Sequence, residues 1–200
     1  MCRNLSLLAL AAVCASATLS LAQVTFTQTA INSGDVGTSA AVSGDFNNDG
    51  ILDIVSINSS TLSFYKGIGG GAFDSPVNQP LTGPWGQAFA ADFNGDGKLD
   101  LALSAACCEG TGQGVTILLG NGDGTFRQGQ TIGSNGKNNS DLYIALADFN
   151  GDHKPDIAVS NSAAYVQIFL GQDNGTFKLS ATTQHGGGSI VAGDFNADGK

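Results

Sequence analysis

Short stretches in which apolar and polar residues alternate recur along the chain, and most of them end at a cluster of Gly, Asp and Asn. One example runs from Val115 to Gly120 and is followed by the turn-forming segment 121–125 and by Phe126. Alternation with a period of two predicts β-strands, and Gly-rich clusters between such stretches predict tight turns. No segment shows a helical period. The pattern therefore predicts an all-β protein of short antiparallel strands.

This strand–turn–strand pattern recurs at 62–73, 115–126 and 166–177, and a nonapeptide that opens Asp-Phe-Asn recurs between its copies. The nonapeptides begin at Asp45, Asp92, Asp148 and Asp194, which are 47, 56 and 46 residues apart. Repeats of this length are typical of solenoids, propellers or arrays. Each repeat is predicted to form four strands, with the acidic loop joining the first strand to the second. The apolar stretches that flank the loops are 40–46, 87–93, 144–149 and 189–195 before them, and 52–57, 99–105 and 156–160 after them.

Phenylalanines occupy equivalent places in these repeats. One set follows the first Asp of each loop and the other set closes each turn. Regular spacing at equivalent strand positions indicates packing, so we expect these rings to lie in the core. They are Phe46, Phe93, Phe149 and Phe195 in the loops, and Phe26, Phe73, Phe126 and Phe177 after the turns.

The acidic nonapeptide carries oxygen-bearing side chains at positions 1, 3, 5 and 9, and usually Gly at position 6. Hard cations such as Ca²⁺ are bound by carboxylate, amide and carbonyl oxygens in this kind of spacing. The alternative is a set of ordinary Asp/Asn/Gly turns between strands, but four copies in the same frame favour calcium. An EF-hand is excluded, because it needs Glu at position 12 and flanking helices, whereas Ser56, Leu103 and Val159 occupy that position here.

Residues 1–22 have the features of a secretory signal peptide, with Arg3, an apolar stretch over 5–15, and small residues at Ser20 and Ala22. We therefore expect an exported, extracellular protein whose mature chain covers 23–200. The apolar stretch is too short to cross a membrane, and no later segment qualifies. Removal of Arg3 makes the formal charge of −9 more negative by one. The remaining basic residues are scattered, which excludes a basic patch for nucleic acid.

The blocks at 91–102 (Ala-Asp-Phe-Asn-Gly-Asp-Gly-Lys-Leu-Asp-Leu-Ala) and 118–126 (Leu-Leu-Gly-Asn-Gly-Asp-Gly-Thr-Phe) resemble the FG-GAP/VCBS repeat family. That family forms integrin-α-like β-propellers, typically seven-bladed, with Ca²⁺ in the loop between the first two strands of several blades. The resemblance covers nearly all of 24–200 and implies a partial ring of about three and a half blades, as the front of a longer protein. The implied blades lie at about 39–80, 85–133 and 141–184, with an incomplete one at 188–200.

By the same resemblance, each loop binds its ion through four side chains and the backbone carbonyl of position 7. The third loop departs from the family pattern at His153 and Pro155, and the fourth lacks its closing carboxylate. The implied ligands are Asp45, Asn47, Asp49, Asp53 and the Ile51 carbonyl; Asp92, Asn94, Asp96, Asp100 and the Lys98 carbonyl; Asp148, Asn150, Asp152, Asp156 and the Lys154 carbonyl; and Asp194, Asn196 and Asp198.

A second candidate site lies where the second repeat has an insertion of about five residues, which contains Cys107, Cys108 and Glu109. Trp85 lies in the crossing that leads into the same repeat. An exposed aromatic ring beside these residues would suit a sugar or a peptide side chain. The alternative is that Trp85 packs between repeats and the cysteine loop has no ligand. A disulfide between neighbouring cysteines is strained, so the sequence leaves open whether one forms.

These features favour a secreted, calcium-binding, non-enzymatic scaffold for adhesion to a glycan or an extracellular protein. Part of an extracellular polysaccharide-degrading, lyase-like enzyme is a second possibility, and a passive spacer in a larger surface protein is a third. Catalysis requires an acid, base or charge-stabilising group in a cleft. The candidates are few: His153 lies inside an acidic loop, His185 lies in a Gly-rich crossing, and Glu109 is the only Glu. We expect no enzymatic activity from residues 1–200.

Overall fold

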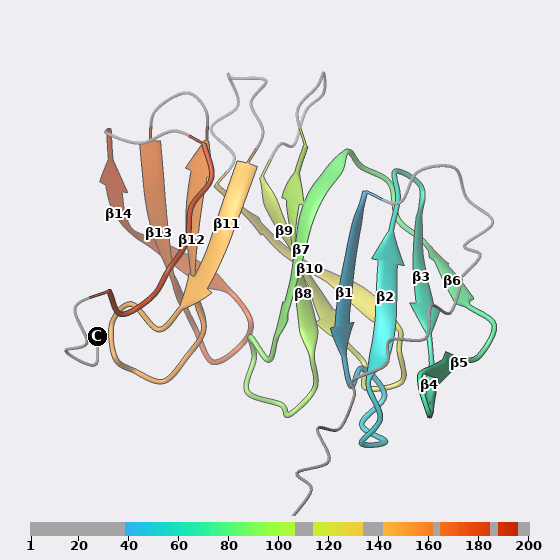
Figure 1. Ribbon diagram of the computed structural model, residues 1–200. Coiled ribbons are helices and arrows are strands. Elements are labelled where there is room, and N and C mark those ends of the chain that lie inside the picture. The colour runs from blue at the N-terminus through green and yellow to red at the C-terminus, as the bar shows by residue number, and fades with distance from the viewer. Residues whose placement is uncertain (1–38, 107–113, 134–141, 162–164, 185–187, 196–200) are drawn as a thin grey trace, which may run out of the picture.

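A computed structural model of the chain describes residues 39–106, 114–133, 142–161, 165–184 and 188–195 (Figure 1). Every regular element in these ranges is a β-strand, which confirms the all-β prediction. The strands form three four-stranded sheets and one small hairpin, β4 (Gly67–Gly69) and β5 (Ala72–Phe73). The three sheets consist of β1 (Ala40–Gly44), β2 (Asp53–Ile57), β3 (Thr61–Tyr65) and β6 (Val77–Pro80); β7 (Trp85–Ala91), β8 (Asp100–Ala105), β9 (Val115–Gly120) and β10 (Phe126–Ile132); and β11 (Leu142–Ala147), β12 (Asp156–Asn161), β13 (Tyr165–Gly171) and β14 (Phe177–Thr183).

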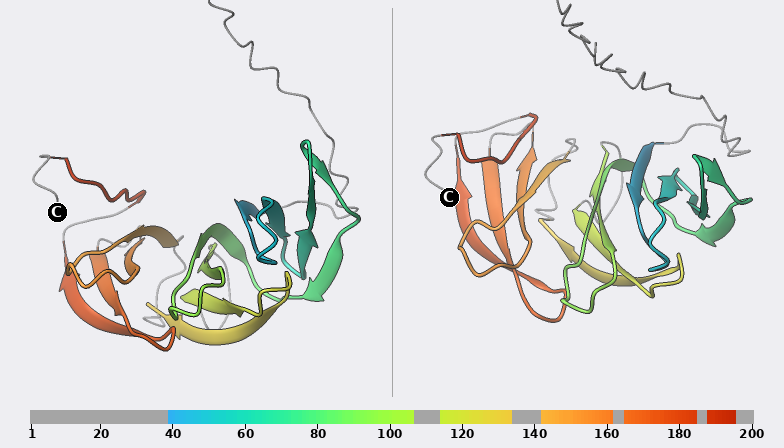
Figure 2. Two further views of the ribbon diagram at one scale, coloured as in Figure 1. Left: turned by 90° about the horizontal axis from the view of Figure 1, so that it is seen from below. Right: turned by 60° about the horizontal axis from the view of Figure 1, so that its bottom comes forward.

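Within each four-stranded sheet the strands follow one another in chain order, and every neighbouring pair is antiparallel. The three sheets stand side by side in an arc, with β10 and β14 on its convex side (Figure 2). The first strands β1, β7 and β11 are neighbours across the arc. The sheets are therefore three consecutive blades of a β-propeller, here named the first, second and third blade.

The hydrophobic core lies between the blades. One buried cluster joins the first blade to the second and contains Phe46, Phe64, Leu101 and Phe126. The other joins the second blade to the third and contains Phe93, Ile117, Ile157 and Phe177. All six residues of β8 in the second blade are buried, and so are all six residues of β12 in the third blade.

The phenylalanines show how the blades are joined. The loop ring of one blade meets the turn-closing ring of the next in an edge-to-face contact, with centroids 5.7 Å apart for Phe46–Phe126 and 5.5 Å apart for Phe93–Phe177. The prediction that all these rings lie in the core is wrong for Phe149, which is 42% exposed, and for Phe195, which is 83% exposed. The reason is that each loop ring is covered by the following blade, and the described residues supply no blade after the third.

Two of the remaining predicted phenylalanine positions and one predicted strand also differ from expectation or lie outside the described residues. Phe73 is only partly buried. Residues 189–195, predicted to be a strand, are not paired in a sheet. Phe26 lies outside the described residues.

Glutamine side chains add a polar clamp to each junction. The carboxamide of Gln79 in β6 donates to the Phe126 carbonyl (2.5 Å) and accepts from the Phe126 N–H (3.0 Å). Gln130 in β10 makes the same pair of bonds with Phe177, at 3.2 and 2.6 Å. A primary amide can pair with a backbone N–H and C=O in this way because it is both donor and acceptor. Each clamp therefore replaces the strand pairing that is missing between separate sheets.

Candidate metal centre

The first acidic loop connects β1 to β2 and is held by hydrogen bonds from its own backbone. The Asp45 carboxylate accepts from the N–H groups of Asp49 (3.0 Å) and Gly50 (2.8 Å). Asn47 Oδ1 accepts from Asp49 N–H (2.9 Å), and Asp49 Oδ1 accepts from Ile51 N–H (3.0 Å). Short Asp and Asn side chains fold the chain in this way because they reach the amide two residues ahead. The loop is therefore ordered by the same oxygens that are predicted to bind the ion.

The second and third loops, which lead into β8 and β12, repeat this network at the corresponding positions. Position 1 accepts from the N–H of position 6 at 2.8 Å in both loops, for Asp92 and for Asp148. In both loops the Asn at position 3 accepts from the N–H of position 5, and the Asp at position 5 accepts from the N–H of position 7, as in the first loop. Three copies with different intervening residues thus adopt one geometry, so the shared Asp and Asn positions determine it.

Positions 4 and 6 of each loop take up the left-handed backbone conformation. Four of these six places are Gly, with φ between 73° and 82°. The other two are Asn48 (φ 58°) and His153 (φ 65°), the only non-glycine residues with positive φ in the described part of the chain. Asn and His are both enriched at positive φ among non-glycine residues, but each has a Cβ that Gly lacks, with a steric cost of up to about 1–2 kcal/mol. The third loop therefore keeps the shape of the others at the expense of local strain.

The Asp at position 9 has a role that the sequence pattern alone does not reveal. Asp53, Asp100 and Asp156 have no exposed surface. In the second blade, Asp100 Oδ2 accepts from Phe93 N–H (2.9 Å) and Oδ1 accepts from Gly120 N–H (2.7 Å). The first and third blades repeat both bonds. Each of these carboxylates therefore links the acidic loop to a glycine of its own blade, which ends the third strand in the second and third blades and lies two residues after it in the first.

The glycine that donates to this carboxylate completes the arrangement; it ends the third strand in the second and third blades and begins β4 in the first blade. A Cβ at Gly120 would overlap the carbonyl oxygen of Leu99, and Gly67 and Gly171 lie equally close to the carbonyls of Leu52 and Pro155. The close approach brings the glycine N–H to the buried carboxylate. The repeated Gly that follows each third strand was the available sequence signal for this contact, since a strand that ends in Gly often marks a close backbone approach.

The loops concentrate negative charge, and the pKa values of two of their carboxyl groups are shifted in opposite directions. Burial raises the pKa of Asp100, and the nearby charges of Asp96 and Asp92 raise it further. The pKa of Asp49 is lowered, chiefly by the hydrogen bond from Ile51 N–H and also by Lys66. A divalent cation at the loop would favour the charged form of a carboxylate such as Asp100, which burial disfavours.

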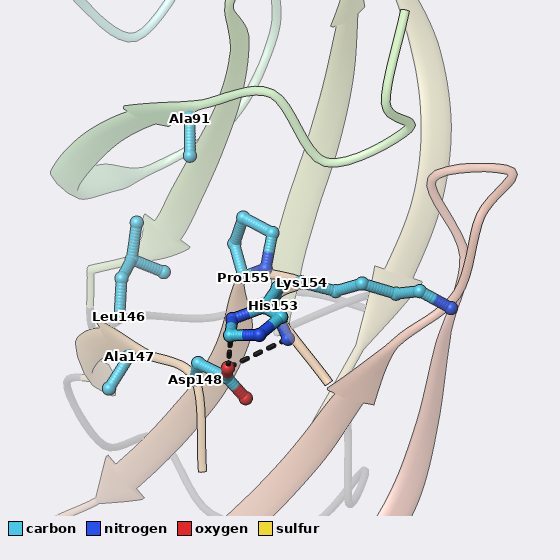
Figure 3. Close-up of a pocket in the computed structure, with 7 residues that line it drawn as sticks. All are labelled: Ala91, Leu146, Ala147, Asp148, His153, Lys154 and Pro155. Atoms are coloured by element: carbon cyan, nitrogen blue, oxygen red, sulfur yellow. Dashed lines mark hydrogen bonds and ion pairs between the residues drawn. The ribbon is translucent and has the colours of Figure 1, made fainter. Parts of the chain in front are cut away.

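Each loop also has a basic side chain against one of its carboxylates. Lys66 Nζ lies 3.2 Å from Asp49, and Lys98 Nζ lies 3.8 Å from Asp96. In the third loop His153 Nδ1 lies 3.8 Å from Asp148, in the pair drawn in Figure 3. These contacts are exposed and contribute little stability, so a bound ion could displace them at small cost.

The donor chemistry of the loops fits a hard cation, because every candidate ligand in them is an oxygen atom. In the ranges that the structure covers, no three Asp, Glu, His or Cys side chains form a cluster that could hold a metal by themselves. Binding therefore requires the Asn side chain of position 3 and the predicted carbonyls of Ile51, Lys98 and Lys154 as well. Of the ligands predicted in the fourth loop, only Asp194 is described, and Asn196 and Asp198 lie outside the described residues.

A cavity of about 370 Å³ lies beside the third loop, at its junction with the second blade (Figure 3). Its wall includes Ala91, Leu146 and Pro155, together with Asp148 and His153. At the preceding junction the Leu99 side chain packs against Gly44, the counterpart of Ala91. Pro155, at the position of Leu99, is the smaller side chain, so this junction is less completely filled.

Trp85 does not occupy the surface position that a ligand-binding role requires. It begins β7, is 9% exposed and belongs to the core between the first and second blades, with Gly83 against its ring. The alternative interpretation, packing between repeats, describes this position. Cys107, Cys108 and Glu109 lie outside the described residues, as does the predicted signal peptide.

Antiparallel four-stranded blades that share one type of acidic first loop define a β-propeller repeat protein. The model of the FG-GAP-like repeat matches the chain over residues 45–103, 92–159 and 148–200. These segments together span well over half of the sequence, so the chain belongs to the FG-GAP-like repeat family. No curated protein matches the chain. Within the described ranges, no helix is long and apolar enough to cross a membrane.

Proposed function

We propose that this chain is an exported calcium-binding propeller that acts as a non-enzymatic scaffold for a glycan or an extracellular protein. The observation that supports the proposal best is the acidic loop, which has the same hydrogen-bonded geometry in three consecutive blades. FG-GAP-like repeats suggest a propeller-type binding or scaffold domain. Calcium, export and the partner are the parts that require experiment.

The ion would be held by the side chains of positions 1, 3, 5 and 9 and the carbonyl of position 7 in each loop. Bound Ca²⁺ would supply two positive charges among three carboxylates and would rigidify the link between the first two strands. With free calcium tenfold above the dissociation constant, each site would stabilise the folded state by about 1.4 kcal/mol. Three such sites are appreciable against a typical domain stability of about 5–15 kcal/mol.

A binding role agrees with the arrangement of the exposed polar groups. The acidic loops and the Gly-rich turns share one edge of the blades, as shown by the ion pair between Lys154 of a loop and Asp173 of a turn (2.7 Å). Loops carried on a rigid β scaffold are a common place for recognition. The one described histidine, His153, lies inside an acidic loop.

Isothermal titration calorimetry on EGTA-treated, dialysed protein tests the proposed binding of calcium. We expect calcium to bind at more than one site per chain and to raise the melting temperature, with magnesium much weaker. Substituting Asn for Asp45, Asp92 and Asp148 together should abolish the heat of binding, whereas Asp123→Asn, an exposed Asp of a Gly-rich turn, should not. Absence of calcium binding in the unsubstituted protein would disprove the metal part of the proposal.

The scaffold part is tested separately with calcium-loaded protein on glycan and extracellular-protein arrays. A retained partner whose binding disappears in EGTA supports the proposal. Release of unsaturated sugar products from a polysaccharide would instead assign the chain to the lyase-like alternative. Calcium binding without any partner would leave the spacer alternative as the better description.

A further inference from the structure

Four Asn-Gly dipeptides lie in the part of the chain that the structure describes, and they occupy two kinds of turn. Two lie at positions 3 and 4 of acidic loops, at Asn94-Gly95 and Asn150-Gly151. The other two lie in the Gly-rich turns of the second and third blades, at Asn121-Gly122 and Asn174-Gly175. A fifth, Asn135-Gly136, lies outside the described residues. The four share one local sequence, so differences in their surroundings come from the fold.

Asparagine is a thermolabile residue, and the Asn-Gly dipeptide can lose its side-chain amide without an enzyme. Hydroxide removes the proton of the glycine N–H, and the nitrogen then forms a bond to the Cγ atom of the asparagine. The bond from Cγ to Nδ2 breaks, Nδ2 takes a proton from water and leaves as ammonia, and water opens the resulting succinimide to aspartate or isoaspartate. Glycine favours the ring closure because it has no side chain to obstruct it. The reaction therefore requires a glycine N–H that solvent can reach and an asparagine side chain that can turn towards it.

The acidic loops do not meet these requirements. In the second blade the Gly95 N–H donates to Asp92 Oδ1 (2.8 Å). A hydrogen bond to a charged acceptor is roughly twice as strong as a neutral one, and the nearby negative charge also opposes loss of the proton. The side chain is held as well, because Asn94 Oδ1 accepts from the Asp96 N–H (2.9 Å). The loop of the third blade repeats both bonds, at 2.7 and 2.8 Å.

The Gly-rich turn of the third blade protects its asparagine in another way. Asn174 Oδ1 accepts from the N–H (3.1 Å) and the hydroxyl group (2.6 Å) of Thr176. The Gly175 N–H donates to the Gln172 carbonyl (3.1 Å). Gly175 is also buried, against Leu119 of the second blade. Solvent hydroxide therefore does not reach this N–H.

The equivalent turn of the second blade lacks these protections. Asn121 is exposed, and neither its Oδ1 atom nor the Gly122 N–H has a hydrogen-bond partner among the described residues. The asparagine side chain makes one bond, from Nδ2 to the Thr125 hydroxyl group (2.9 Å), which is neutral and exposed to competing water. Gly122 is only partly buried, beside the side chain of Lys98. The positive charge of this lysine favours a glycine nitrogen that has lost its proton.

We propose that Asn121 is a site of spontaneous deamidation, which the fold selects from four equivalent dipeptides. The reaction places a new negative charge beside Lys98. The isoaspartate product also inserts a methylene group into the backbone between Asn121 and Gly122. The same turn carries Gly124, whose N–H donates to the Phe46 carbonyl of the first blade (3.1 Å). Deamidation therefore loosens the contact between the first two blades.

Peptide mapping by tandem mass spectrometry tests the site. The protein is incubated in mildly alkaline buffer with EGTA, so that a bound ion cannot protect the loops, and samples are taken over several weeks. We expect Asn121 to deamidate at least about tenfold faster than Asn94, Asn150 or Asn174, a ratio that requires a difference in barrier of only about 1.4 kcal/mol. In urea the four sites should react at similar rates, because their local sequences are alike. An unmodified Asn121, or an equal rate at Asn94 or Asn150 in the folded protein, would overturn the proposal.

Asn121→Gln is the matched control for the structural effect. Glutamine would have to close a larger ring and reacts far more slowly, and Gln172 already occupies the equivalent position of the third blade, with the same bond from its N–H to a threonine carbonyl. The melting temperature of the unsubstituted protein should fall as Asn121 is converted, whereas the variant should keep its value. An unchanged melting temperature after full conversion would disprove the effect on the blade contact. Neither readout depends on the proposed calcium role or on a partner.

Discussion

The buried carboxylate of Asp100 gives the most direct test of how each blade is held together. It accepts two backbone hydrogen bonds, from Phe93 and Gly120, and has no exposed surface. Replacement by Asn keeps the shape but turns one acceptor oxygen into an NH₂ donor. In either orientation of the amide, one of the two buried N–H groups then faces a donor.

The expected cost follows from these two bonds. A hydrogen bond to a charged acceptor is worth about 1.5–3 kcal/mol, and a buried N–H without an acceptor costs about 1–3 kcal/mol. Part of this is offset in the variant, because burial raises the pKa of Asp100 and the native protein must hold its charged form at pH 7. We expect Asp100→Asn to lower the free energy of unfolding by about 2–4 kcal/mol. With an m-value of about 2 kcal/mol/M, the urea midpoint should fall by about 1–2 M.

The measurement is made in EGTA, so that a lost metal ligand does not contribute. Asp92→Asn is the control, because Asp92 lies in the exposed part of the same loop and Asn also forms such turns. It should shift the midpoint in EGTA by less than about 0.3 M, an effect within the range of ordinary surface substitutions. In calcium both variants should lose the stabilisation that the ion provides. Equal midpoints for the two variants in EGTA would refute the structural role of Asp100.

Three further variants test the loops and junctions by urea denaturation. His153→Gly should raise the free energy of unfolding by up to about 1 kcal/mol by relieving the left-handed strain, and an unchanged or lower value would mean that the strain is absent. Gly124→Ala should lower the free energy of unfolding by at least about 2 kcal/mol, because the added Cβ would overlap Phe64 of the neighbouring blade. Gly71 has a similar φ and open space around it, so Gly71→Ala should lower the free energy of unfolding by only about 1 kcal/mol. Gln130→Ala removes the clamp to the third blade and should lower the free energy of unfolding by about 1–3 kcal/mol. Gln128→Ala, on the same strand, should lower it by less than about 0.5 kcal/mol.

Much of the fold follows from local patterns that the sequence displays openly. Alternation and Gly-rich turns locate the strands, and the repeat length identifies a propeller-like array. The position of the acidic loop between the first two strands is also confirmed, since β1 ends at Gly44 and β2 begins at Asp53. These features could be predicted because each depends on residues within a few positions of one another.

The sequence did not predict the glutamine clamps between blades, because the residues that form each clamp are far apart along the chain. Gln79 and Gln130 act on Phe126 and Phe177, each 47 residues further along the chain. The two Gln–Phe spacings are identical, but a glutamine on an outer strand has no local feature that separates it from an ordinary surface residue. Only the positions of neighbouring blades give it a partner. The structural role of the ninth-position Asp was missed for a similar reason, because its bond to the glycine N–H near the end of the third strand is not local.

Phe93 and Phe149 show how far a repeat sequence determines the environment of its own residues. Both follow the first Asp of an acidic loop and both donate their N–H to the Asp at position 9. Yet Phe93 is 3% exposed and Phe149 is 42% exposed. The difference lies in the next blade, which supplies Phe177 to the first ring and, among the described residues, supplies nothing to the second. In a propeller the repeat specifies both halves of a junction, but burial is achieved only when two blades meet.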